Sequence, residues 1–218
     1  MSKSGEQKLS RFDVGDALSL VAAVMVIVGL FMALVYAPDA INLPAGPVRL
    51  TQHVFYFHVA SAWVGFFAFF VTLVGSVMYL WKGERRWDIL ALSSVEIGVA
   101  FIAMVLVTGP LWARPTWGIW WTWEPKLTTA AILELIYVAY LMLRAMTEDP
   151  ERRARFAAVL GIVGFIDVPI VFGAVRWWGA TSTSAHPIVV RGGGFDIGPK
   201  MLTALLFCIA AFTVLYFA

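Results

Sequence analysis

The chain has 218 residues, of which 61% are hydrophobic and only 14% are charged. Soluble domains carry roughly 25% charged residues, so this composition excludes an ordinary soluble domain and indicates a polytopic membrane protein. The net charge of +2 does not indicate a nucleic-acid partner, because the basic residues lie in short gaps between apolar runs. The single cysteine, Cys208, excludes a disulfide framework and a thiolate metal cluster.

Six apolar stretches are long enough to cross a bilayer, which takes about 20 residues of helix. In chain order these stretches are 17–37, 53–81, 89–112, 128–146, 156–178 and 200–218. The first stretch is longer than the core of a signal peptide, so we expect it to be a retained span. The sequence therefore predicts an all-α integral membrane protein with six transmembrane helices, forming a single domain over residues 1–218.

The distribution of basic residues predicts the orientation of the chain. Ten of the 16 lysines and arginines lie in the amino-terminal tail and in the short connections after the second and fourth spans. Because cytoplasmic connections are enriched in lysine and arginine, we expect these segments and both termini to be cytoplasmic. The connections 38–50, 113–127 and 179–199 then lie on the outer side.

The outer connection around residues 112–128 is rich in tryptophan and contains five of the ten tryptophans of the chain. Trp117, Trp120 and Trp121 are spaced i, i+3 and i+4, which predicts a short helix on the membrane surface with the three indoles on one face. An aromatic belt at the headgroups is the alternative interpretation. Because four of the tryptophans fall within seven residues, we favour a surface that binds a large, flat, apolar ligand.

The three histidines, His53, His58 and His186, all lie at or near the outer side. A single histidine at such a place is more often an interfacial polar residue than a ligand. Imidazole is nevertheless a common axial ligand of haem iron, and two histidines from separate segments could hold one iron. His53 and His58 are five residues apart, about 140° around a helix, so they do not both face one ligand.

Charged residues within or beside the spans leave two interpretations open. Glu96, Glu134 and Asp167 either form hydrogen bonds between helices or mark a polar path through the membrane. On the outer side, Arg114 and Lys126 could bind ligand carboxylates or lipid phosphate.

The segment Trp117-Gly-Ile-Trp-Trp-Thr-Trp-Glu124 resembles the tryptophan-rich signature W-G-x-W-W-x-W-D of haem-handling proteins. Matching segments around it are Leu106-Val-Thr-Gly-Pro110, Tyr56-Phe-His-Val59 and Arg176-Trp-Trp178. The resemblance covers nearly the whole chain. The sequence is most similar to the CcmC family, which delivers haem in system I cytochrome c maturation in the bacterial inner membrane. Three features depart from the family pattern: Glu124 stands in place of aspartate, Pro125-Lys126 resembles the system II branch, and His186 lies farther beyond Trp177-Trp178 than is usual for the second histidine.

The resemblance implies a protein that holds haem b at the periplasmic surface and catalyses no reaction of its own. It implies His58 and His186 as the axial ligands of the iron. The remaining residues that we expect to contact haem are Trp117, Trp120, Trp121, Trp123, Glu124, Arg114 and Lys126. The implied partners are a CcmE-like haem chaperone, a CcmD-like small subunit and CcmA/CcmB-like ABC transporter subunits.

Two other functions remain as alternatives. The first is a component of a system II, CcsA-like cytochrome c haem lyase, although those chains are longer and have more spans. The second is a proton-coupled small-solute transporter that uses Glu96, Glu134 and Asp167. A transporter of that kind has broken helices near the midplane, and Pro169 beside Asp167 permits one break.

Overall fold

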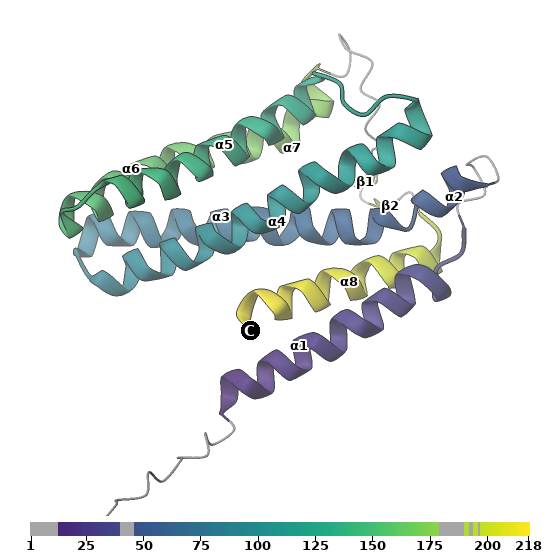
Figure 1. Cartoon of the computed structure of the whole chain (residues 1–218), viewed down its shortest axis with the longest axis horizontal. Helices are drawn as coiled ribbons and strands as arrows, with labels where there is room; N and C mark the ends of the chain where they lie inside the picture. Colours follow the sequence, from purple (N-terminus) through teal and green to yellow (C-terminus); the bar gives the residue numbers. More distant parts are fainter. Residues whose placement is uncertain (1–12, 40–45, 179–189, 192–193, 196) are drawn as a thin grey trace, which may run out of the picture.

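The computed structural model describes residues 13–39, 46–178, 190–191, 194–195 and 197–218 (Figure 1). The described part of the chain is helical apart from one two-residue pair of antiparallel strands, β1 and β2. The elements are α1 (Val14–Phe31), the π-helix η1 (Met32–Tyr36), α2 (Pro47–Thr51), α3 (Val54–Lys82), α4 (Arg85–Trp117), α5 (Pro125–Met146), α6 (Pro150–Phe165), α7 (Asp167–Trp178), β1 (Val190–Arg191), β2 (Gly194–Phe195) and α8 (Pro199–Phe217).

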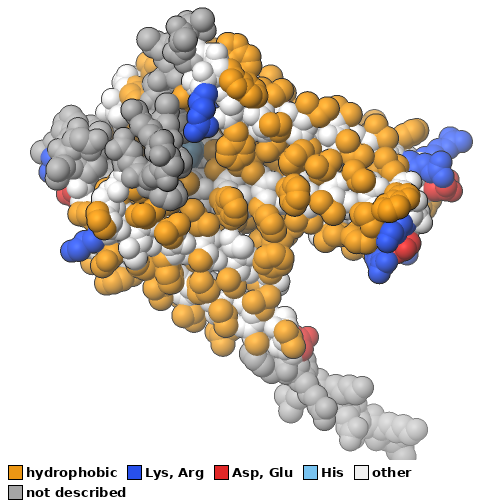
Figure 2. Space-filling view, turned by 180° about the vertical axis from the view of Figure 1, so that it is seen from behind, with side chains coloured by type: hydrophobic (Ala, Val, Ile, Leu, Met, Phe, Trp, Pro, Cys, Tyr) orange, Lys and Arg blue, Asp and Glu red, His pale blue; other side chains and the backbone are white. Residues whose placement is uncertain are grey.

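These helices form six segments that are long and apolar enough to span a membrane, as the sequence predicts. The segments are Val14–Tyr36, Arg49–Lys82, Arg85–Trp117, Pro125–Met146, Pro150–Trp178 and Pro199–Phe217. Figure 2 shows hydrophobic side chains along the flanks of the molecule, with lysine, arginine, aspartate and glutamate gathered near its ends. The fifth segment is broken between α6 and α7, because Pro169 cannot donate to the carbonyl of Phe165.

The helices run roughly along one direction, so their connections collect at two ends (Figure 1). The α3–α4 and α5–α6 turns, the start of α1 and the end of α8 lie at one end. The other end holds α2, the segment between α4 and α5, the end of α7 and the start of α8. This grouping agrees with the distribution of basic residues, while the identity of the cytoplasmic end stays a prediction.

Helix α3 contributes to both hydrophobic cores. One core joins α3 to α1, η1 and α8 around Tyr56, Leu205 and Cys208. The other joins it to α4, α5, α6 and α7, where the Phe69 ring stacks on Tyr137 at a centroid distance of 3.6 Å. The fold therefore fixes α3 from two sides, including Tyr56 in its first turn.

Two glycines allow α3 and α4 to pack closely. A Cβ atom on Gly65 would lie 2.5 Å from Ile102 Cδ1, and one on Gly98 would lie 2.5 Å from Phe69 Cε1. Each helix thus receives a side chain of the other where it has none of its own. Small residues at such interfaces let membrane helices approach each other.

We expect Gly98→Ala to lower the free energy of unfolding by about 1–3 kcal/mol, the usual cost of overpacking. The change would otherwise favour helix by about 1 kcal/mol, but the buried Phe69 ring has no room to move away. Unfolding in mixed detergent–SDS micelles measures the difference. Gly198→Ser is the control, because a Cβ atom there meets nothing within 4 Å and serine is a good residue at this helix N-cap. Equal stability of the two variants would contradict the close packing.

Candidate functional site

The tryptophan-rich segment is not a surface helix, so that prediction is wrong. Helix α4 continues to Trp117 and ends at Gly118, whose φ of 79° is left-handed, and residues 118–124 form no helix before α5 begins at Pro125. Glycine commonly ends helices in this conformation, and a residue before proline avoids the α region. Glu124 accordingly has an extended backbone, with ψ of 155°.

The tryptophans pack edge to face instead of forming one flat surface. The rings of Trp112 and Trp117 lie 5.0 Å apart at 85°, and those of Trp121 and Trp123 lie 5.7 Å apart at 77°. Trp123 is 78% exposed and Trp120 is 56% exposed, whereas Trp117 and Trp121 are partly buried. Trp120 and Trp123 therefore present exposed aromatic surface, and Trp121 packs against Trp123.

Arg114 holds the turn that follows α4. Its Nη1 donates to the carbonyl of Gly118, and its guanidinium lies 6.0 Å from the centre of the Trp120 ring. The side chain therefore orients the start of the tryptophan segment. At the other end of the segment, Glu124 is buried where α5 begins.

Buried polar groups flank the tryptophan segment. Among the described residues, Trp121 Nε1, Thr122 Oγ1 and Thr128 Oγ1 are buried and have no hydrogen-bond partner. Buried polar groups in proteins are nearly always hydrogen-bonded, so these three groups retain unused hydrogen-bonding capacity next to the tryptophans.

His58 lies in the first turns of α3 and faces α4. Its Nδ1 is 2.9 Å from Thr108 Oγ1, and its Cε1 would be 3.4 Å from a Cβ atom on Gly109. Lys126, at the start of α5, is near enough to His58 and Glu124 for their charges to interact. The fold therefore brings His58 against α4, the helix that leads into the tryptophan segment, and within electrostatic range of Lys126, which follows that segment.

His53 has a different role. Its Nδ1 is 2.5 Å from the carbonyl oxygen of Ala33, and its Nε2 is 3.4 Å from Asp39 Oδ1. The imidazole therefore connects the start of α3 to η1, and both ring nitrogens contact other parts of the chain. His186 lies outside the described residues.

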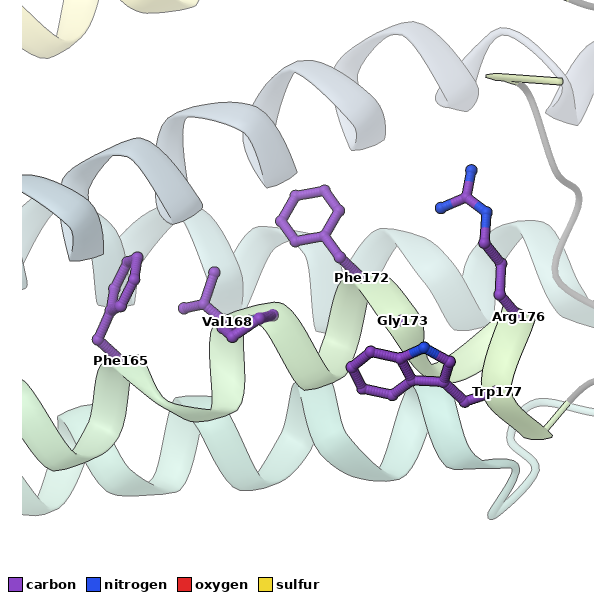
Figure 3. Close-up of a pocket in the computed structure, with 7 residues that line it drawn as sticks. Phe165, Val168, Phe172, Gly173, Arg176 and Trp177 are labelled. Atoms are coloured by element: carbon purple, nitrogen blue, oxygen red, sulfur yellow. The ribbon is translucent and has the colours of Figure 1, made fainter. Parts of the chain in front are cut away.

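An open hollow of about 480 Å³ runs along α7, from the break at Phe165 to Trp177 (Figure 3). Phe165 and Phe172 project towards α3, where they contact Phe70 and Phe66, and Arg176 stands at the end of the row. The Trp177 indole lies over Gly173, where an added Cβ would come within 2.6 Å of the ring. The charge of Arg176 interacts with that of Lys126 at the start of α5, so two cations lie near the end of the tryptophan segment. The sequence did not predict this hollow; the i, i+4 spacing of Gly173 and Trp177 is the signal that could have indicated it.

The carboxylates within the spans lie on separate helices. Glu134 on α5 is buried, Asp167 begins α7, and Glu96 on α4 borders a second cavity with Arg144 and Arg153. Among the described residues, Glu96 therefore has two basic neighbours, Arg144 and Arg153, on the side of the molecule away from the tryptophan segment.

Comparison with known proteins gives a family match over most of the chain. The sequence profile of the CcmC family, described as Heme exporter protein C, matches residues 8–218. A protein named Heme exporter protein C from Bradyrhizobium diazoefficiens is 35% identical over 199 residues, covering 91% of this chain and 73% of the relative. The protein of the same name from Escherichia coli K12 is 29% identical over 130 residues, covering 59% and 52%. A ccmC-like mitochondrial protein of cytochrome c biosynthesis from Arabidopsis thaliana is 28% identical over 194 residues, covering 87% and 72%.

Proposed function

The chain belongs to the CcmC family of heme exporter proteins, and on this basis we propose that it binds haem and delivers it for cytochrome c maturation. Haem is the cargo in this function, and the protein holds, orients and releases it without catalysing a reaction. The bound form is haem b, held at the periplasmic side of a bacterial inner membrane. The match to this family favours it over the system II lyase alternative.

One observation supports the proposal: His58 on α3 packs against Thr108 of α4, the helix that leads into the tryptophan segment, and its charge interacts with that of Lys126, which follows the segment. An imidazole supplies a ligand to iron, and exposed indoles supply aromatic surface to the porphyrin ring. A lysine or arginine supplies charge to the propionates. The imidazole comes from α3, the indoles from the 118–124 segment and the lysine from α5, so the proposed site depends on the tertiary fold.

The proposed site assigns a role to each residue. His58 binds one face of the iron, and His186 is proposed for the other face. Trp120 and Trp123 contact the ring with their exposed faces, and Trp117, Trp121 and Glu124 support them. Lys126 binds a propionate, while Arg114 orients the turn and contributes positive charge.

Delivery requires a partner that receives the haem. We propose a CcmE-like chaperone as the recipient, with a CcmD-like small subunit and CcmA/CcmB-like transporter subunits completing the assembly. The exposure of Trp120 and Trp123 supports this, because an acceptor can approach the ring from that side.

The exposed tryptophans should contribute measurably to haem affinity. We expect the double variant Trp120→Ala, Trp123→Ala to weaken haem binding roughly 10- to 100-fold, because each aromatic contact contributes about 0.5–1.5 kcal/mol beyond burial. Titration of the detergent-purified protein with haemin, followed at the Soret band, measures the change. Trp81→Ala is a matched control, because Trp81 is 77% exposed but lies at the opposite end of α3. An equal loss in the control would contradict a specific role.

Delivery is tested in a bacterium that lacks its own CcmC gene. Expression of this chain should restore covalently bound haem on the CcmE chaperone, detected by haem staining of the denatured chaperone. A transporter of small solutes would leave the chaperone without haem, and that result, with the chain present in the membrane, would overturn the proposed function.

A further inference from the structure

We infer that Thr108 positions His58 and keeps its proton on Nδ1, so that Nε2 carries the lone pair that binds haem iron. The inference rests on the proposed function for the identity of the ligand. The position of the proton follows from the hydrogen bonds of Thr108 and holds in the absence of haem.

The hydroxyl group of Thr108 has one hydrogen to donate. Its Oγ1 is 2.7 Å from the carbonyl oxygen of Met104, one helical turn earlier, and 3.4 Å from that of Val105. A backbone carbonyl only accepts hydrogen bonds, so the hydroxyl donates to Met104. Its oxygen then acts as the acceptor towards His58 Nδ1 at 2.9 Å. Nδ1 is therefore the protonated nitrogen of a neutral His58.

The neighbouring residue shapes the same contact. Gly109 presents no side chain towards the imidazole, and a Cβ atom there would lie 3.4 Å from His58 Cε1. The ring therefore lies directly against α4, where the hydroxyl of Thr108 sets its rotation. Residues 108 and 109 together fix both the plane of the imidazole and its tautomer.

This arrangement has a known consequence for metal binding. Histidines that bind metals almost always donate their second N–H to another group, which fixes the ring and raises the basicity of the bound nitrogen. Loss of such a partner typically lowers metal affinity 10- to 100-fold. Thr108 is thus a positioning residue that acts through His58.

Two measurements test the inference. The first is ¹⁵N NMR of histidine-labelled, haem-free protein in bilayers, with the His58 signals assigned by a His58→Gln variant. We expect the wild type and Thr108→Ser to show a protonated Nδ1, and Thr108→Val to show a shift towards the other tautomer. A protonated Nε2 in the wild type, or an unchanged Thr108→Val spectrum, would overturn the inference.

The second measurement is haemin titration of the same variants. We expect Thr108→Val to bind haem about 10- to 100-fold more weakly and Thr108→Ser to remain within about threefold of the wild type, because serine keeps the hydroxyl. Unchanged affinity in Thr108→Val would overturn the positioning role. If the wild type binds no haem, the proposed function fails and the role of Nε2 fails with it, while the NMR result still decides where the proton lies.

Discussion

Replacement of His58 with alanine is expected to lower haem affinity by at least about 100-fold, because loss of an axial ligand should exceed the cost of losing one of its supporting groups. His58 is held by Thr108 on α4 and lies within electrostatic range of Lys126. His53, at the N-cap of α3, is not placed to replace it, since its ring nitrogens are directed to Ala33 and Asp39. Haemin titration of the purified variant measures the loss, and the Soret band of the remaining complex reports the change in ligation.

Two other histidine variants separate ligation from folding. His53→Ala should keep haem affinity within a fewfold and lower stability, because it removes the contact between α3 and η1. His186→Ala should alter the Soret band if His186 binds the second face. A Soret band and affinity unchanged in His58→Ala would contradict the ligand assignment.

The second large effect concerns stability at the opposite end of the molecule. Asp88 on α4 and Arg144 on α5 form a two-bond ion pair, with Nη1–Oδ1 at 2.5 Å and Nη2–Oδ2 at 3.0 Å. Their side chains are only 16% and 10% exposed. We expect Asp88→Ala to cost about 3–5 kcal/mol in the free energy of unfolding, because it leaves Arg144 buried without its carboxylate.

An exposed pair on the neighbouring α6 provides the control. Arg155 Nη2 lies 2.8 Å from Glu151 Oε1, but both side chains are more than 60% exposed. Glu151→Ala should cost no more than about 0.5 kcal/mol, as for other exposed pairs on a helix. Unfolding in mixed micelles compares the two variants, and a double variant Asp88→Ala, Arg144→Ala should recover part of the loss. Equal effects of Asp88→Ala and Glu151→Ala would contradict a stabilising role for the buried pair.

The spans were predictable because hydrophobicity and length determine them. Each of the six predicted stretches corresponds to one membrane-spanning segment. The break between α6 and α7 was also predictable, because Pro169 is visible in the sequence and permits a break there. The positions of Gly118 and Pro125 carried enough information to exclude a surface helix, but the i, i+3, i+4 spacing of the tryptophans suggested the wrong conformation.

The contacts that define the site were not predictable in the same way. The Thr108–His58 hydrogen bond joins residues 50 positions apart, and it depends on the close packing of α3 on α4. The different role of His53 depends on the carbonyl of Ala33, which lies in the π-helix η1. Helical geometry indicated only that His53 and His58 do not share a ligand, and the tertiary structure shows which of them faces α4.

The site combines a fixed half with an exposed half. Thr108 and Gly109 hold His58 on two packed helices, whereas Trp120 and Trp123 are exposed on a non-helical segment. In the proposed site, the fixed His58 would orient the iron, and the exposed tryptophans would leave the ring accessible. This division suits a protein that holds haem and then transfers it.

The position of bound haem tests the proposed site most directly. A cryo-EM map of the haem-loaded protein, enlarged by a rigid antibody fragment, should show the iron bound to His58 Nε2 and the porphyrin against Trp120 and Trp123. Its propionates should lie near Lys126. Haem density elsewhere, such as the cavity between Glu96 and Arg153 at the opposite end, or a map of the haem-loaded protein with no haem beside His58, would contradict the proposed site.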